Sequence, residues 1–549
     1  MKVTKALFFL LAFAVLVLFA AAGCTKNEVV EPEPVFEPIT FTMFSGDQAQ
    51  APTEDNPVVL KIRELTGVTI EFEFLVGDLF EKMGVIIASG DFPDLMNPSQ
   101  ARATAMEAGV FMPLEDLMAD YPNIMSHYEP YLDKMFAACG GEHIYLLDNY
   151  GRYYGDWVPT YHNGPAFWIQ KAVLADAGYP HPKTLDEYFD LIRNYAAKYP
   201  EIDGQETIGF EILSFDWRSF CLKNPPQHLI GHPNDGDVVV DFETGIAELY
   251  QDKDYAKQYY RKLNEMYHEG LITVDTFTQS YDMYLAKVAT GRVLGMFDQY
   301  WNFQDGERPL RQQEKWERTY VPLGITYEGY TDWYQEAPTF TGGNGMGLTV
   351  DCKDPERALQ YIDMLLTEDM QKLLQWGIEG VNYTVDANGV FFRSEEQRRN
   401  AHDRNWVIRN MADQLWNQFP KIQGIFSDGN WCDPGEQPGE LLAEQSKYDQ
   451  EFLSHYGFSR TNEFLSPPPA PQSPSYYPVW AFNIEDGSDA KIAINKITEL
   501  ENKYLPRIIT EDADKFDQAW DDYVALLHKS GYRAYLDEVN RQIAERMGN

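Results

Sequence analysis

Few residues of this chain have the type and spacing that catalysis or metal binding would need. Ser488 and Lys491 match an S-x-x-K arrangement, but Ser488 stands where a helix begins, the ordinary place of a capping serine. His228 and His232 could share a metal ion, yet prolines flank them and no third ligand is obvious. With 85 acidic residues, no carboxylate pair can be ranked as catalytic. We therefore predict that the protein is not an enzyme and holds no metal or cofactor.

Aromatic side chains are more informative, because many of them fall in loops beside glycine, aspartate and asparagine. The chain has 12 Trp, 34 Tyr and 32 Phe. The richest loops read YGRYYGDWVPTYHNG, FDWRSF, FDQYWNF, TDWYQEAPTF, DGNWCDPG and YYPVWAFN. A pyranose stacks its C–H face on a ring while its hydroxyls bind charged or amide groups, so this composition favours a saccharide site. The competing interpretation is that these large rings fill cores and interfaces.

The elements that must position these loops are alternating strands and helices. Residues 39–43 and 68–74 alternate apolar and polar side chains, which predicts two strands, and residues 55–67 between them have helical spacing. Further helix signals stand at Thr184–Glu187 as a capping box, at Asp354–Pro355, and over residues 514–547 with a break near Gly531. This order predicts an α/β fold with extra helices.

The amino terminus carries an export signal. Two lysines precede an apolar run over residues 6–23, which is typical of a removable signal peptide; a transmembrane anchor is the alternative. Residues 21–24, AAGC, resemble the lipobox of bacterial lipoproteins, in which the cysteine is acylated after cleavage before it. The resemblance implies that residues 1–23 are removed and that Cys24 anchors the protein outside the cytoplasmic membrane. Residues 24–37 would then be a flexible tether.

Composition restricts the partners. The net charge of −40 argues against nucleic acid, and it disfavours anionic ligands unless their site is locally basic. Cys139, Cys221, Cys352 and Cys432 are far apart in the sequence. They fit two disulfides in an oxidising compartment or four buried thiols, and the sequence leaves both open.

Four segments, taken in order, resemble the extracellular solute-binding proteins of ABC importers, in the carbohydrate-binding cluster. They are FWIQKAVLADAGYPHPKTLDEYFDLIRNY (167–195), YRKLNEMYHEGLI (260–272), KVATGRVLGMFDQYWNF (287–303) and GMGLTVDCKDPERALQYIDMLLTEDMQKLLQWGIEGVNY (345–383). The last of them, together with KYLPRIITEDADKFDQAWDDYVALL, is most similar to the large LipO-like lipoprotein subgroup.

The resemblance implies a two-lobed periplasmic-binding-protein-like fold of type II, with a hinge and extra C-terminal helices. Lobe 1 would take residues 38–163 plus 342–395, and lobe 2 residues 164–341 plus 396–549. A monomer of this kind closes its lobes on an oligosaccharide or related solute and delivers it to the permease subunits of an ABC transporter. Some relatives carry a calcium loop, but residues 202–212 are too short and too poor in ligands for one.

The resemblance also implies where the ligand is bound. Stacking would fall to tryptophans and tyrosines, and hydroxyl recognition to carboxylates and an arginine. The expected ligand-binding residues are Asp47, Asp94, Trp157, Tyr161, Trp217, Arg218, Asp298, Tyr300, Trp301, Trp376 and Glu379.

Three other functions remain open from the sequence. A peptide receptor on the same scaffold would capture ligand termini with charged groups. A surface glycan-processing enzyme would need two carboxylates placed across a sugar. An adhesin or structural lipoprotein would have no cleft that closes on a small ligand.

Overall fold

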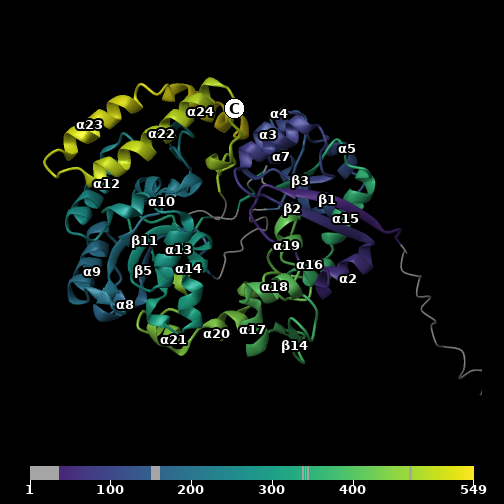
Figure 1. Ribbon diagram of the computed structural model, residues 1–549, viewed down its shortest axis with the longest axis horizontal. Coiled ribbons are helices and arrows are strands. Elements are labelled where there is room, and N and C mark those ends of the chain that lie inside the picture. Colours follow the sequence, from purple (N-terminus) through teal and green to yellow (C-terminus); the bar gives the residue numbers. More distant parts are fainter. Residues whose placement is uncertain are drawn as a thin grey trace, which may run out of the picture.

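The protein forms two α/β lobes that lie side by side (Figure 1). The computed structural model describes residues 36–149, 161–336, 339–340, 342, 345–468 and 473–548. Each lobe has its own hydrophobic core, one around Phe41 and Leu348 and the other around Phe167 and Phe297. The expected fold class, two-lobed α/β with additional C-terminal helices, is confirmed.

The first lobe is built on a five-stranded sheet in the order β2-β1-β3-β13-β4. Its strands are β1 (Ile39–Ser45), β2 (Val68–Phe74), β3 (Leu95–Asn97), β4 (Leu147–Asp148) and β13 (Gly345–Leu348). β1 is parallel to β2 and β3, whereas β13 is antiparallel to β3 and β4. The helices of this lobe are α2 (Pro57–Thr66), α3 (Leu79–Ser89), α4 (Arg102–Glu107), α5 (Glu115–Met118), α6 (Pro122–Tyr128), α7 (Leu132–Ala138), α15 (Pro355–Leu365) and α16 (Glu368–Gln375).

The second lobe is built on a four-stranded sheet in the order β12-β5-β11-β8. Its strands are β5 (Pro165–Gln170), β8 (Ile208–Glu211), β11 (Val293–Gln299) and β12 (Tyr320–Leu323). β11 is parallel to β8 and antiparallel to β5. The helices here are α8 (Lys171–Asp176), α9 (Leu185–Lys198), α10 (Phe220–Lys223), α11 (Pro225–Leu229), α12 (Asp254–His268), α13 (Tyr281–Ala289), α14 (Tyr300–Gln312), α21 (Lys447–Ser454), α22 (Asp489–Thr510), α23 (Phe516–Leu527) and α24 (Tyr532–Arg546).

Short elements complete the described chain. The remaining helices are α17 (Glu395–Ala401), α18 (Arg404–Asn410), α19 (Gln414–Gln418) and α20 (Pro438–Glu444). The remaining strands are β6 (Glu201–Ile202), β7 (Gln205–Glu206), β9 (Val239–Val240), β10 (Ala247–Glu248), β14 (Thr384–Val385) and β15 (Phe391–Phe392). Single 3₁₀ turns include η1 (Ser99–Ala101), η3 (Asp216–Ser219), η4 (Val274–Phe277) and η8 (Val479–Ala481).

Local sequence signals explain where several helices begin and end. The Thr184 hydroxyl accepts a hydrogen bond from the Glu187 amide, and the Glu187 carboxylate accepts one from the Thr184 amide, which is the predicted capping box. The Asp354 side chain caps α15, and Ser488 caps α22. Gly531 has φ of +87°, a left-handed conformation that separates α23 from α24 at the predicted break.

The chain stays in the first lobe longer than its sequence suggests. Residues from 396 onward were expected in lobe 2, but Ala412, Leu415 and Phe419 pack into the core of lobe 1. The side-chain amide of Asn56, at the start of α2, donates hydrogen bonds to the carbonyls of Ile408 and Met411. These contacts fix α18 and α19 to lobe 1. The chain packs into the core of lobe 2 again from α21 onward.

The lobes touch through α4 and the segment from η8 to Asp486. The Arg102 guanidinium donates to the Ala481 carbonyl (2.7 Å), and the Thr104 hydroxyl donates to the Asp486 carboxylate (2.6 Å). Figure 1 places the C-terminal end of α24 beside α4 of lobe 1. Across the described ranges, no helix has the length and apolarity needed to cross a membrane.

Candidate cleft between the lobes

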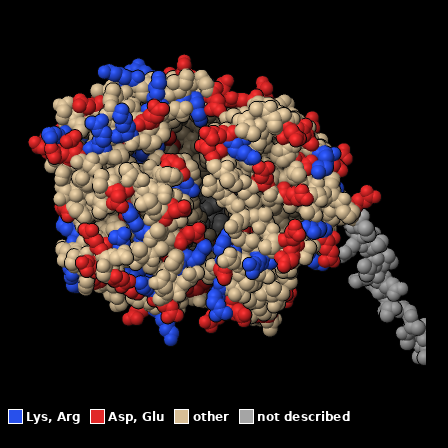
Figure 2. All heavy atoms as spheres, in the orientation of Figure 1, with Lys and Arg blue, Asp and Glu red and all other residues tan. Residues whose placement is uncertain are grey.

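The carboxyl ends of the central strands in both sheets lie where the chain crosses between the lobes. The chain leaves lobe 1 after Asp148, the last residue of β4, and that residue pairs with Gly345, where β13 begins. It enters lobe 2 at Pro165, which pairs with Gln299, the last residue of β11. Ligands of open α/β sheets bind beyond the carboxyl ends of the strands. The surface between the two lobes is deeply hollowed there (Figure 2).

On the lobe 1 side, polar side chains collect beyond β1 and β3. The Asn97 amide donates to the Gln418 side-chain oxygen (2.8 Å) and lies 3.4 Å from a carboxylate oxygen of Asp47. The Asn149 amide donates to the Asn417 carbonyl (2.7 Å), while its own side-chain oxygen is buried with no hydrogen-bond partner in the described structure. Asn97 and Gln418 are buried, whereas Asp47 is half-buried. The Asp47 carboxylate is therefore the group of this edge that can accept from a ligand hydroxyl, and the two amides beside it orient it.

On the lobe 2 side, two tryptophans form an aromatic platform. β8 and β11 are parallel neighbours, so the residues that follow them, in η3 and at the start of α14, meet at one edge. The rings of Trp217 and Trp301 stack with centroids 5.7 Å apart and planes 11° apart, and 51% of the Trp217 surface is exposed. Phe220 lies beside Trp301 at 5.9 Å. An exposed, flat apolar face at a sheet edge can receive the C–H face of a sugar ring.

Arg218 holds this platform in place. Its guanidinium lies 4.5 Å from the Trp217 ring centroid and 4.1 Å from that of Tyr281. It also donates to the Asp216 carboxylate (2.7 Å) and to the Asn302 side-chain oxygen (3.2 Å). A guanidinium stacked between two rings and paired with a carboxylate has little capacity left for a charged ligand, so its main effect is on ring position.

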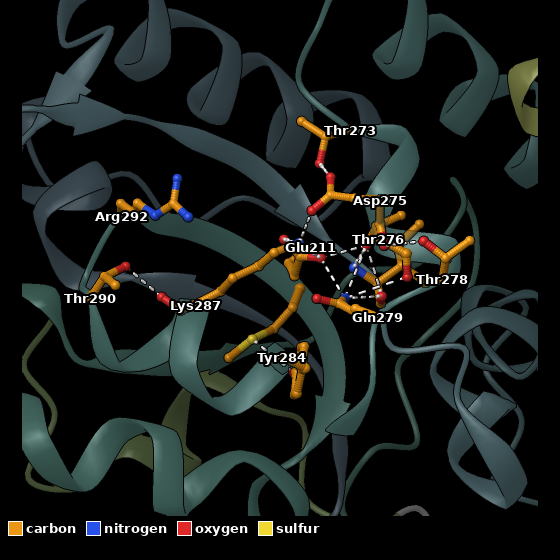
Figure 3. Close-up of polar contacts among 12 residues, drawn as sticks. Glu211, Thr273, Asp275, Thr276, Thr278, Gln279, Tyr284, Lys287, Thr290 and Arg292 are labelled. Atoms are coloured by element: carbon orange, nitrogen blue, oxygen red, sulfur yellow. Dashed lines mark hydrogen bonds and ion pairs between the residues drawn. The ribbon is translucent and has the colours of Figure 1, made fainter. Parts of the chain in front are cut away.

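A buried polar cluster fixes the strand end that leads to Trp217 (Figure 3). Glu211, the last residue of β8, accepts hydrogen bonds from the Thr276 hydroxyl (2.5 Å) and the Gln279 amide (2.7 Å). The Lys287 ammonium lies 3.2 Å from Glu211 and 2.8 Å from Asp275. Because η4 and α13 are thereby tied to the end of β8, Tyr281 is held where it can contact Arg218.

Asp298 and Tyr300 were expected to bind ligand, but both lie beneath the platform. The fully buried Asp298 carboxylate accepts from the Tyr284 hydroxyl (2.5 Å) and the Asn302 amide (2.9 Å). Burial raises the pKa of Asp298 to about 6. The Tyr300 hydroxyl donates to Glu307 (3.0 Å). Both side chains orient α14 and thereby Trp301.

Asp94 and Trp376 are placed away from the cleft. Asp94 precedes β3, so it stands at the amino end of that strand, where it accepts from Thr42 and pairs with Lys353 (3.1 Å). The Trp376 ring has no exposed surface, packs on Tyr383 and Phe391, and donates its ring N–H to the Trp431 carbonyl (2.9 Å). The structure therefore gives Asp94 a role in strand pairing and Trp376 a role in a small core.

The other predicted residues lie at the surface, in the segment that crosses between the lobes, or outside the part of the chain that the structure describes. Glu379 lines a surface pocket of about 360 Å³ between α2 and α16, together with Lys61, Lys372 and Tyr383. Tyr161 is half-buried where the chain enters lobe 2. Trp157 and Cys24 lie outside the described residues. Of the predicted set, the structure brings Trp217, Arg218 and Trp301 together on one lobe and places Asp47 at the matching edge of the other.

The sequence reasoning missed the amide side chains of the lobe 1 edge. Asn97 ends β3, Asn149 follows β4, and Gln418 comes from α19, which was assigned to the wrong lobe. Asn97 and Asn149 carry a usable signal, because each stands at the carboxyl end of a short buried strand, the end that faces the crossing.

The histidine pair has a structural explanation. His228 is buried against Tyr334 and Phe297, and one ring nitrogen lies 3.1 Å from the His232 carbonyl. Within the described ranges, no group of three or more His, Cys, Asp or Glu side chains could hold a metal ion. Cys139, Cys221, Cys352 and Cys432 are buried free thiols, so their disulfide alternative does not hold.

Burial of His228 predicts a pH dependence of stability. Burial lowers the pKa of His228 to about 3, below its usual 6.5, so the unfolded chain binds one more proton between these values. Stability should therefore fall as the pH drops below about 6.5, by about 1.4 kcal/mol for each unit from this residue. Urea unfolding at pH 7.5, 6 and 5 should show a shallower pH slope for His228→Phe than for the wild-type protein. Equal slopes would contradict the assignment.

Comparison with known proteins supports the two-lobed fold and also identifies the family. Residues 51–372 match the family described as bacterial extracellular solute-binding protein. The fructooligosaccharide ABC transporter substrate-binding protein FusA of Streptococcus pneumoniae is 27% identical over 302 residues, which are 50% of this chain and 54% of FusA. The match thus spans about half the length of that relative. Lipoprotein LipO of Bacillus subtilis is 22% identical over 397 residues, 69% of this chain and 74% of LipO.

Solved structures share the whole architecture. FusA in complex with kestose superposes with a TM-score of 0.62 at 19% identity, covering 93% of this chain and 100% of that one. A solute-binding protein from Bifidobacterium longum infantis, described as binding HMO, gives a TM-score of 0.62 at 18% identity over 92% and 99% of the two chains. At these identities the likeness shows the fold alone. Together, the family match over more than half of the sequence and the shared two-lobed fold show that this chain belongs to the bacterial extracellular solute-binding proteins.

Proposed function

We propose that this protein captures an oligosaccharide between its lobes and presents it to the permease of an ABC importer. The observation that carries the proposal is the stacked pair Trp217 and Trp301 at one edge of the cleft, with Asp47, Asn97 and Gln418 at the matching edge of the other lobe. A sugar presents both kinds of surface at once, because its rings are flat and its rim is polar. FusA and LipO, as an oligosaccharide-binding protein and a lipoprotein of the same family, support this assignment.

Closure of the lobes would supply the transport signal. A permease can distinguish a loaded receptor from an empty one only if ligand stabilises the closed arrangement more than the open one. Contacts to ligand from both lobes would do so, since each half-site is incomplete without the other. The acylated Cys24 and the tether over residues 24–37 would keep the receptor at the outer face of the cytoplasmic membrane, within reach of its permease.

A thermal-shift screen tests the function. The protein lacking residues 1–24 is melted with oligosaccharides, and peptides and monosaccharides serve as controls. An oligosaccharide at a hundred times its dissociation constant should add about 2.7 kcal/mol to the free energy of unfolding. The ligand should be recovered unchanged by mass spectrometry. Stabilisation by peptides but not glycans would indicate a peptide receptor, and recovery of a cleaved glycan would indicate an enzyme.

A further inference from the structure

A group of positively charged side chains lies at the seam where the lobes touch. Arg102 belongs to α4 and Lys134 to α7, both in lobe 1, whereas Arg546 ends α24 in lobe 2. Arg102 is close to the polar edge described above, because only η1 separates it from β3, which ends at Asn97. The three residues, Arg102, Lys134 and Arg546, are called the seam cluster below.

Arg546 has the least compensated charge of the three. Both terminal nitrogens of its guanidinium are buried, and neither has a hydrogen-bond partner in the described structure. The guanidinium carbon lies 4.2 Å from the ring centroid of Phe482. Burial and the nearby Arg102 lower the pKa of Arg546 to about 10. A buried guanidinium without an acceptor is unfavourable unless another group supplies one.

The other two members of the cluster add to this positive charge. Among the residues that the structure describes, Lys134 has two hydrogen-bond acceptors, the carbonyl oxygens of Phe340 and Tyr477, each at 3.5 Å. Burial and the charge of Arg546 lower the pKa of Lys134 to about 8. Arg102 donates to the Ala481 carbonyl and is attracted by the carboxylate of Asp148. Lys134 and Arg546 thus add two positive charges to the Arg102–Asp148 pair, in a chain whose net charge is −40.

Neighbouring acids are already committed to other partners. The Asp486 carboxylate accepts from the Thr104 hydroxyl (2.6 Å) and lies 3.8 Å from the Lys491 ammonium. The Glu107 carboxylate accepts from the Asp486 amide (3.1 Å). Like charges held from both lobes at one seam repel each other, so an anion placed among them would stabilise the contact between the lobes.

We propose that the seam cluster binds the carboxylate of an acidic sugar unit, with Arg546 as its principal donor. A guanidinium presents two parallel N–H groups that match the two oxygens of a carboxylate, a geometry that an ammonium cannot offer. Because the cluster adjoins the Asn97 edge, the acidic unit would be one end of the glycan whose neutral rings stack on Trp217 and Trp301. This inference rests on the proposed function and restricts its substrate class to acidic oligosaccharides.

Glucuronate titrations test the cluster independently of the full glycan. The mature protein is melted with sodium glucuronate, with glucose, and with sodium sulfate, all at one ionic strength held with sodium chloride. Arg546→Met should weaken glucuronate binding about tenfold or more, the usual loss when a charged hydrogen-bond partner is removed. Arg546→Lys, which keeps the charge but not the fork, should give an intermediate loss. Arg541→Met is the matched control, because Arg541 lies on the same helix but pairs with Glu538 at the surface (2.7 Å).

Each outcome decides the proposal. Stabilisation by glucuronate that is lost in Arg546→Met, kept in Arg541→Met and absent with glucose supports it. No shift of the wild-type protein, or an equal shift in both variants, overturns it. A shift that depends on Arg546 with sulfate but not with glucuronate overturns the sugar assignment. If glucuronate binds through Arg546 while no oligosaccharide binds, the proposed function fails and the seam site remains.

Discussion

Replacing Trp301 by alanine should weaken oligosaccharide binding about 30-fold or more, equivalent to about 2 kcal/mol. The loss follows from geometry, because the Trp301 ring stacks on the Trp217 ring with centroids 5.7 Å apart. The Trp301 ring is itself held by the hydrogen bond from its N–H to the Gln299 side chain (2.7 Å). Without the Trp301 ring, the Trp217 ring loses its stacked support as well as the contact to sugar. Trp217→Ala should therefore give a loss of the same order, and Trp301→Phe a smaller one. Isothermal titration with the glycan identified by thermal shift measures all three.

The control must separate loss of a binding surface from loss of any exposed ring. Phe392 lies on the β15 hairpin of lobe 1, 37% exposed, and Figure 1 shows that hairpin at the outer end of the lobe. Phe392→Ala should leave affinity within twofold. If Trp301→Ala binds like the wild-type protein while its melting temperature is unchanged, the aromatic platform is not the sugar site.

Replacing Lys223 by methionine should lower the free energy of unfolding by about 3–5 kcal/mol, the usual result of breaking a buried ion pair. Lys223, on α10, lies 3.6 Å from Glu501 on α22, and both side chains are buried. Burial already raises the pKa of Glu501 to about 7 despite this lysine. Without Lys223 the carboxylate would be left unpaired under the C-terminal helices, which would then hold less firmly to lobe 2. Urea unfolding measures the change.

A double variant and a pH series identify the cause. Lys223→Met with Glu501→Gln should recover much of the loss, because the one carboxylate then left beside this site, Asp237, is partly exposed to water. Because its pKa is raised, Glu501 keeps its proton in the folded protein up to a higher pH than in the unfolded chain. At pH 5 the carboxyl group is therefore neutral and needs no partner, so the loss of unfolding free energy caused by Lys223→Met should be smaller at pH 5 than at pH 8. Lys61→Met, which breaks the exposed pair with Glu64, should change stability by less than about 1 kcal/mol. A loss from Lys223→Met no larger than that would rule out the pair as a stabilising link.

Much of the fold was predictable because its signals are local. The alternation in residues 39–43 and 68–74 gave β1 and β2, and the helix between them ends at Gly67, whose φ of +70° few other residues adopt at low energy. The division into lobes was less predictable after residue 395. Leu415 and Phe419 pack into the core of lobe 1 because Asn56 holds the preceding segment there by hydrogen bonds to Ile408 and Met411. Both partners are more than 350 residues away from Asn56 in the sequence.

The sequence by itself determined that the loops of this protein are rich in tryptophan and tyrosine, which made these loops the candidates for its binding surface. It could not separate Trp301 from Trp376, since a ring is exposed or buried according to the partners that pack on it. Nor could it separate Asp94 from Asn97, which stand at opposite ends of a three-residue strand. Only tertiary structure decided these cases, because the sheet edge that a side chain occupies is set by strand direction and by crossings that join distant parts of the chain.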